Sequence, residues 1–242
     1  PTLISRKGLP VMSDSPCRVL DCAAAARCLR RGGVVIFPTE TFYGLGCLAA
    51  DAAAVARIYQ LKRRPVQRPL PLLAADADQA GAVVWLEAAP PELTARFWPG
   101  PLSLLLPVRP GLPAPLVSAG AGGEDGAAGK AALRVSPHPL AARLARLAGG
   151  ALTASSANLS GRAPARRLEE LDPELLAALA ELGDLGGLLP AVSEAEQPPG
   201  GAPSTLAEPL PPDGDGRPRL RLLRAGAVSA RALAEAGFVC VD

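Results

Sequence analysis

Three short segments of the sequence combine hydroxyl and amide side chains, and each follows a run of residues that predicts a β-strand. They are 38–44 (PTETFYG), 155–158 (SSAN) and 203–205 (PST). Side chains of these types can orient carboxylates, phosphates and ribose oxygens through hydrogen bonds, but none of them is an activated nucleophile. Ser, Thr and Asn also build ordinary turns, so each segment taken alone fits a structural role equally well.

A compact basic motif, KRRP at 62–65, is the strongest single sign of anion binding. On a continuing helix, Lys62 and Arg64 would lie about 200° apart and could not reach one ligand. Pro65 disfavours a helical conformation at Arg64, so the chain leaves the helix here and both cations can face one site. A lysine charge beside a planar guanidinium suits a polyphosphate. The alternative is a solvated basic helix end that stabilises the helix dipole.

Three further residues carry charge or proton-transfer chemistry in unusual settings. Arg134 lies in an apolar stretch between Leu133 and Val135 and therefore needs an anionic partner, either a structural carboxylate or that of a ligand. Arg224 follows another short apolar run, which places a second cation at the end of a predicted strand. His138, the only histidine, stands between two prolines and fits a turn or helix cap better than a catalytic base.

The elements that must position these residues alternate between helices and strands. The predicted helices are 18–31, 51–64, 79–87, 91–97, 139–147, 168–182 and 229–236. The predicted strands are 34–37, 70–74, 102–108, 131–135, 151–154 and 220–223, with a short segment at 204–206. This alternation predicts an α/β architecture in one domain, with polar loops at strand ends, where open α/β sheets bind ligands.

Several stretches are predicted as loops, and one lies at the start of the chain. Residues 39–46 and 155–161 are predicted polar loops, and 111–129 and 194–202 are candidates for segments that close over a ligand. Residues 1–15 are expected to form an N-terminal tail that is either disordered or upstream of the true start, leaving 16–242 as the domain.

Composition excludes several classes of protein. The chain has 242 residues, 25 basic against 23 acidic, and a net charge of +2, which argues against binding nucleic acid through bulk charge. Five cysteines without a CxxC pair favour reduced thiols in the cytoplasm, and no metal site is indicated. No stretch is long and apolar enough to predict a membrane span, and neither a Walker A nor a GxGxxG motif is present.

Taken together and in order, the motifs resemble a known family. The matching stretches are 33–46 (GVVIFPTETFYGLG), 58–65 (IYQLKRRP), 97–102 (FWPGPL), 133–135 (LRV), 156–158 (SAN), 203–205 (PST) and 223–226 (LRAG). They are similar to the YrdC-type domain of the threonylcarbamoyl-AMP synthases, over about residues 25 to 227. The paired K-x-R and S-x-N signatures are weak singly but specific in combination.

The resemblance implies an activity and a fold. Such enzymes convert L-threonine, bicarbonate and ATP into L-threonylcarbamoyladenylate and pyrophosphate, with Mg²⁺ expected to accompany the ATP. A downstream tRNA threonylcarbamoyl transferase then uses the product to modify adenosine 37 of tRNA. The implied fold is a twisted, mostly parallel open sheet with flanking helices and a concave basic ligand face, in the short, single-domain type of the family.

The resemblance also implies roles for individual residues. Lys62 and Arg64 would be catalytic. The residues that would contact ATP or its product are Lys62, Arg64, Ser156, Asn158 and Arg224. Those that would surround threonine and the carbamate are Thr39, Thr41, Arg134 and Ser204.

Departures from the family pattern, and two other interpretations, stay open at this stage. Lys130 stands where the family commonly has Thr, Ser155 replaces a Pro, Ser103 replaces a Thr, and Leu73 stands where longer relatives often have His. One alternative is a module that binds tRNA or double-stranded RNA without catalysis. The other is a paralogue that uses carbamoyl-adenylate chemistry on another acceptor.

Overall fold

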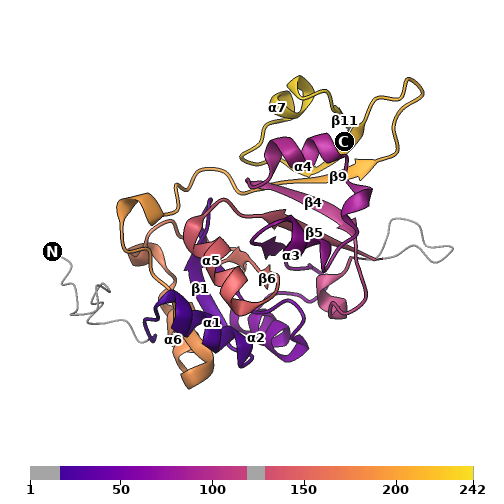
Figure 1. Cartoon of the computed structure of the whole chain (residues 1–242). Coiled ribbons are helices and arrows are strands. Elements are labelled where there is room, and N and C mark those ends of the chain that lie inside the picture. The colour runs from indigo at the N-terminus through magenta and orange to yellow at the C-terminus, as the bar shows by residue number, and fades with distance from the viewer. Residues whose placement is uncertain (1–16, 119–128, 242) are drawn as a thin grey trace.

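Two mixed β-sheets organise the protein (Figure 1). The computed structural model describes residues 17–118 and 129–241, so the expected tail at 1–15 lies outside the described residues. Within them, one sheet has the strand order β7-β2-β1-β8 and the other β11-β10-β9-β4-β5-β3-β6. The strands are β1 (Val34–Pro38), β2 (Tyr43–Gly46), β3 (Leu72–Ala74), β4 (Leu102–Pro107), β5 (Lys130–Val135), β6 (Leu152–Thr153), β7 (Ser155–Ser156), β8 (Gly186–Leu188), β9 (Thr205–Leu210), β10 (Arg219–Arg224) and β11 (Val239–Val241).

The larger sheet corrects one expectation. The α/β class is confirmed, but the sheet is mixed rather than mostly parallel: parallel and antiparallel pairs alternate along it. Strands β9 and β10, for example, are joined by the short connection 211–218 and run antiparallel. Strands joined by a short turn pair in this direction, whereas parallel neighbours require a longer crossover.

Helices cover the sheets on more than one side (Figure 1). They are α1 (Cys22–Arg30), α2 (Ala52–Lys62), α3 (Ala77–Gly81), α4 (Pro91–Phe97), α5 (Pro139–Ala148), α6 (Pro173–Ala180) and α7 (Ala230–Glu235), with short 3₁₀ turns η1 (Leu86–Ala88), η2 (Ala114–Leu116), η3 (Leu168–Glu170), η4 (Gly183–Leu185) and η5 (Glu194–Glu196). Asp21 and Asp51 cap α1 and α2 by accepting hydrogen bonds from backbone N–H groups of their first turns.

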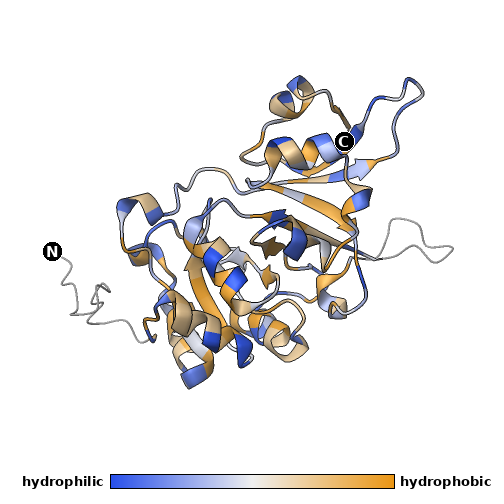
Figure 2. Ribbon diagram, in the orientation of Figure 1, coloured by the Kyte–Doolittle hydropathy of each residue, from blue (hydrophilic) through white to orange (hydrophobic). Residues whose placement is uncertain are grey.

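The core divides on either side of β1. Val34 and Ile36 pack into the larger apolar cluster, while Val35 and Phe37 face the cluster formed with α1 and α5. A strand buried on both faces needs a continuous apolar run, which explains why the sequence 34–37 lacks alternation. In Figure 2 most of the buried strands have hydrophobic colours, whereas the helices carry both hydrophobic and hydrophilic residues.

The predicted elements differ from the structure where local signals were weak. The helix expected at 168–182 divides into η3 and α6, because Asp172 caps a new helix that begins at Pro173. The helix expected at 79–87 is replaced by α3 and η1. Strands β2 and β7 lie in stretches predicted as loops and pair with each other, Gly44 opposite Ser156. Strands β8 and β11 were not predicted.

The described part of the chain contains no helix that is both long and apolar enough to cross a membrane.

Candidate active site

One cavity collects residues from segments far apart in the sequence. It has a volume of about 140 Å³ and opens where the ends of several strands meet. Its lining is Thr39, Thr41, Phe42, Tyr43, Gly44, Arg64, Pro71, Arg134, Ala154, Ser155, Ser156, Pro203, Ser204 and Arg224. Seven of the nine site residues expected from the sequence line it; the two that do not are Lys62 and Asn158.

Three arginines give this first cavity its positive charge. Arg64 follows α2, Arg134 lies in β5 and Arg224 ends β10. Burial lowers the pKa of Arg224, and the charges of Arg134 and Arg64 lower it further. The described lining includes no Asp or Glu, so a ligand that carries negative charge would relieve this repulsion.

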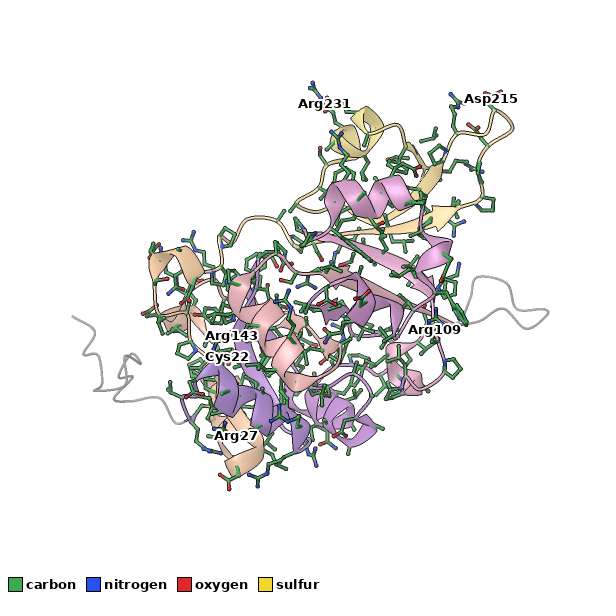
Figure 3. The ribbon with its side chains drawn as sticks, in the orientation of Figure 1. Cys22, Arg27, Arg109, Arg143, Asp215 and Arg231 are labelled. Carbon is green, nitrogen blue, oxygen red and sulfur yellow. The ribbon has the colours of Figure 1, made fainter. Side chains whose placement is uncertain are left out.

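Charged residues elsewhere contrast with this arrangement. Figure 3 labels Arg27 on α1 and Arg143 on α5, and Asp215 and Arg231 at the C-terminal end of the molecule. All four are solvent-exposed. Exposed charges of this kind are hydrated and screened, so they carry little information about ligands.

The anionic partner that Arg134 needs is a glutamate from a distant segment. Arg134 Nε donates to Glu40 Oε1 at 2.5 Å, and Ser136 Oγ donates to Glu40 Oε2 at 2.5 Å. Burial by itself raises the pKa of the Glu40 carboxyl, but the charge of Arg134 and the bond from Ser136 outweigh it and hold that pKa below its ordinary value. Of the two partners that the sequence left open, the structure contains the structural carboxylate.

Lys62 lies beside the first cavity rather than in its wall. Helix α2 ends at Lys62, and Arg63 takes a left-handed conformation with φ 49°. This turn separates the two cations: Lys62 points inward, where its Nζ donates to Ser156 O and Asn158 O at 2.5 Å each, and Arg64 reaches the cavity. The two cations therefore do not share the wall of the first cavity in this structure: Arg64 lines it, and Lys62, only 2% exposed, does not.

The environment of Lys62 also changes its acidity. Burial lowers the pKa of its ammonium group from 10.5 to about 8, and the nearby Arg64 contributes in the same direction. Within the described residues its hydrogen-bond partners are carbonyl groups and not carboxylates.

Asn158 is held tightly and keeps one atom without a partner. Its Nδ2 donates to Leu159 O at 2.8 Å and Arg162 O at 2.7 Å. Its Oδ1 is buried and accepts no hydrogen bond from the described residues. Buried polar atoms are rarely left unpaired, so this oxygen marks a position where a ligand or water donor would be favourable.

The wall formed by Ser204 and Arg224 depends on a glycine. Arg224 Nη2 donates to Ser204 O at 2.7 Å and to Ser204 Oγ at 3.0 Å, and Ser103 Oγ lies 3.1 Å from Ser204 Oγ. A Cβ on Gly226 would lie 2.3 Å from Pro203 O, so only glycine lets the 224–226 turn approach this closely. The LRAG motif is thus required by packing as well as by charge.

The hydroxyl wall comes from the loop between β1 and β2. Thr39 Oγ1 donates to Phe42 O at 2.7 Å and lies 3.4 Å from Thr41 Oγ1. The segment 194–202 is hydrogen-bonded to this loop, since Gly200 N donates to Thr41 O at 2.9 Å. His138 is the N-cap residue of α5, as its flanking prolines suggested, and its Nε2 lies 2.9 Å from Glu196 O.

Two residues that the sequence singled out lie elsewhere. Lys130 pairs with the buried Glu208 at 2.6 Å and is not in the lining of the first cavity. Leu73 is fully buried in the cluster with α1 and α5. Glu40 and Ser136 were not assigned roles from the sequence. The feature that could have identified Glu40 is that it is the acidic residue within the hydroxyl-rich motif 38–44.

A second cavity adjoins the first. It has a volume of about 360 Å³ and shares Arg64, Pro71 and Arg224 with the first cavity. The rest of its described lining is Gln67, Arg68, Pro69, Ser103, Ala132 and Leu206. The two arginines therefore stand at the boundary between two spaces that one extended ligand could occupy together.

The fold and this site define an α/β domain whose cavity is lined by cations and hydroxyl groups, an arrangement that suits an anionic ligand. Residues 27–208 match the family model of Sua5, YciO and YrdC proteins, whose description is "telomere recombination". A threonylcarbamoyl-AMP synthase of Stenotrophomonas maltophilia (strain K279a) is 43% identical over 174 residues, which cover 70% of this chain and 88% of the relative. Another, from Alkalilimnicola ehrlichii, is 40% identical over 178 residues, covering 73% of this chain and 87% of the relative.

A solved structure agrees with these relatives. The crystal structure of P. abyssi Sua5 complexed with L-threonine superimposes with a TM-score of 0.70 at 29% identity, covering 91% of this chain and 58% of that one. E. coli YciO has the same fold, with a TM-score of 0.60 at 21% identity, covering 85% of this chain and 89% of that one. The chain belongs to the Sua5/YciO/YrdC family, the threonylcarbamoyl-AMP synthase family that its motifs resemble.

Proposed function

We propose that this chain is an L-threonylcarbamoyladenylate synthase that uses L-threonine, bicarbonate and ATP and releases pyrophosphate. The observation that carries the proposal is the first cavity, where three arginines converge with hydroxyl side chains that include Thr39, Thr41 and Ser204, and where the described lining offers no activated nucleophile. The relatives named threonylcarbamoyl-AMP synthase and the L-threonine complex of Sua5 support the substrate assignment.

The reaction needs orientation and charge stabilisation more than covalent catalysis. The amine of threonine and bicarbonate give a carbamate with loss of water. A carbamate oxygen then forms a bond to the α-phosphorus of ATP, and the bond from that phosphorus to pyrophosphate breaks. Negative charge grows on phosphate oxygens during this step, so prearranged cations lower its barrier. Holding the reactants together supplies a further large part of the acceleration.

The residues divide between the two ends of the product. Arg134, Thr39, Thr41 and Ser204 surround the threonine and the carbamate. Arg64 and Arg224, at the boundary of the two cavities, hold the phosphates, and Ser156 contributes a hydroxyl beside them. Lys62 acts from behind this wall by holding the carbonyl groups of Ser156 and Asn158. Asn158, whose Oδ1 has no hydrogen-bond partner among the described residues, completes the nucleotide contacts.

The chain itself offers no ligand set for Mg²⁺ in the described residues. Groups of three or more His, Cys, Asp or Glu side chains that could hold a metal do not occur there. Hard divalent cations prefer carboxylate and phosphate oxygens. Any Mg²⁺ would therefore enter bound to the phosphates of ATP.

The labile product also implies a partner. A mixed anhydride hydrolyses in water, so a tRNA threonylcarbamoyl transferase must take up the product promptly. The tRNA binds to that transferase, or transiently to this enzyme. We assign the chain to the cytoplasm, where these substrates and reduced thiols coexist. Two segments were expected to close over the ligand and exclude water, 194–202 and 111–129. Most of 111–129 lies outside the described residues, so 194–202 is the candidate for this role.

The test is incubation of the protein with ATP, L-threonine and bicarbonate. We expect pyrophosphate release that depends on L-threonine, together with an adenylate of the expected mass by mass spectrometry. Omission of L-threonine and its replacement by L-valine are the controls. Failure to release pyrophosphate in the complete mixture would leave the RNA-binding interpretation ahead.

A further inference from the structure

Glu40 is the least expected charged residue near the first cavity. Its side chain is 8% exposed, it does not line the cavity, and it comes from the loop after β1, 94 residues before Arg134. A buried carboxylate paired with one of the three arginines could neutralise ligand-binding charge, which would harm an anion site. Its geometry indicates instead that it acts on the orientation of one arginine.

Glu40 occupies only one edge of the Arg134 guanidinium. Within the described residues the hydrogen bond of Arg134 to protein is made by Nε, the atom nearest the backbone. The two Nη groups have no protein partner there, and Arg134 lines the first cavity. A guanidinium anchored at Nε keeps its two terminal groups available as a planar pair of donors.

The carboxylate is itself held in place. Ser136 Oγ donates to Glu40 Oε2, and the same Oγ accepts a hydrogen bond from His138 N at 3.2 Å. Ser136 lies two residues beyond Arg134, at the end of β5, so both sides of the carboxylate are fixed by one strand and its continuation. The Arg134 side chain, which has several rotatable bonds, is therefore restricted before any ligand binds.

We propose that Glu40 is a positioning residue for the amino acid substrate: it holds Arg134 through Nε so that both Nη groups face the first cavity and bind the substrate carboxylate as a two-bond pair. The assignment rests on the proposed function, because it takes the occupant of this cavity to be L-threonine. It adds to that function by making recognition of the carboxylate depend on a residue that does not touch the ligand.

The expected signature is a split between the two substrates. Glu40→Ala frees the guanidinium to rotate, so we expect the KM for L-threonine to rise at least tenfold while the KM for ATP changes less than twofold. Glu40→Gln keeps an acceptor for Nε but loses the ion pair, so the guanidinium is held by a hydrogen bond in which only the donor is charged. We expect its effect to fall between those of the wild type and Glu40→Ala.

The experiment measures steady-state kinetics for both substrates and L-threonine binding by calorimetry, using the full chain. Glu87→Gln is the matched control, because Glu87 also pairs with an arginine, Arg109 at 3.7 Å, but is exposed and remote. Thermal unfolding of each variant shows whether it is folded. If Glu40→Ala does not fold, Glu40→Gln carries the test alone.

The outcomes separate this inference from the proposed function. Weaker L-threonine binding with ATP unaffected supports the positioning role. Equal L-threonine affinity in the wild type and Glu40→Gln, or equal losses for both substrates, overturns it while the synthase activity of the wild type stands. A wild-type chain that binds no L-threonine overturns the proposed function and this inference with it.

Discussion

Arg134 and Lys62 are both buried cations next to the first cavity, yet the protein compensates their charges differently. Arg134, 4% exposed, pairs with the carboxylate of Glu40. Lys62, 2% exposed, donates to two backbone carbonyl groups, and the described residues give it no carboxylate. An opposite charge offsets part of the free energy of hydration that a buried cation loses, and carbonyl dipoles offset it without supplying a counter-charge.

This difference explains what each cation can do. Arg134 presents hydrogen-bond donors to the cavity. Lys62 is a clamp for the 156–158 loop, and its lowered pKa makes the clamp sensitive to pH. The spacing K-x-R therefore places two cations differently: Arg64 lines the cavity, and Lys62 holds the loop beside it through two backbone carbonyl groups.

The largest expected effect comes from Arg134→Ala. It leaves the Glu40 carboxylate buried without its counter-ion, which costs about 3–5 kcal/mol in the free energy of unfolding. Urea denaturation at pH 7 measures this. The double variant Arg134→Leu with Glu40→Leu should recover most of the loss. Arg27→Ala, on the exposed surface of α1, is the control and should change stability by less than about 0.5 kcal/mol. A loss below 1 kcal/mol for Arg134→Ala would contradict the description of a buried pair.

Lys62→Met should have a smaller effect on stability. It removes the donor from two carbonyl groups but leaves no buried charge, so we expect a loss of about 2 kcal/mol by the same denaturation measurement. Because the 156–158 loop loses its clamp, kcat/KM for ATP should also fall. A cost equal to that of Arg134→Ala would remove the distinction between the two cations.

Arg64→Ala tests the direct role without disturbing the core. Arg64 is half-buried, and its side chain donates only to the carbonyl groups of Arg68 and Pro69 among the described residues. We expect turnover to fall at least tenfold, about 1.4 kcal/mol of transition-state stabilisation, with little change in unfolding. Arg63→Ala is the neighbouring control, since Arg63 is exposed and pairs with Glu174. Equal activity in the two variants would show that Arg64 does not touch the phosphates.

The smallest effect is a pH dependence of stability that belongs to Lys62. Its pKa is about 8 in the folded protein against an ordinary 10.5, so between these values the unfolded chain binds more protons than the folded one. Stability therefore rises with pH in this window. Relative to Lys62→Met, the wild type should gain about 1 kcal/mol between pH 8 and pH 9. Parallel pH profiles for the two proteins would contradict the lowered pKa.

Much of the site could be predicted because its motifs are local. The hydroxyls of 39–41, the arginine before Pro65 and the turn at 224–226 each carry their chemistry within a few residues. Pairings between distant segments were beyond prediction. The bond of Arg134 to Glu40, the short strands β2 and β7, and the inward direction of Lys62 all depend on contacts across long stretches of chain.

The amino-acid sequence alone determined the α/β class, the main helices and buried strands, the family and most of the residues around the cavity, because periodicity and short motifs act locally. Tertiary structure alone decided the mixed direction of the strands and the partner of each buried charge. It also decided which of Lys62 and Arg64 lines the cavity. The physical reason is that desolvation and charge compensation depend on what the folded chain brings within a few ångströms, and sequence separation does not record that distance.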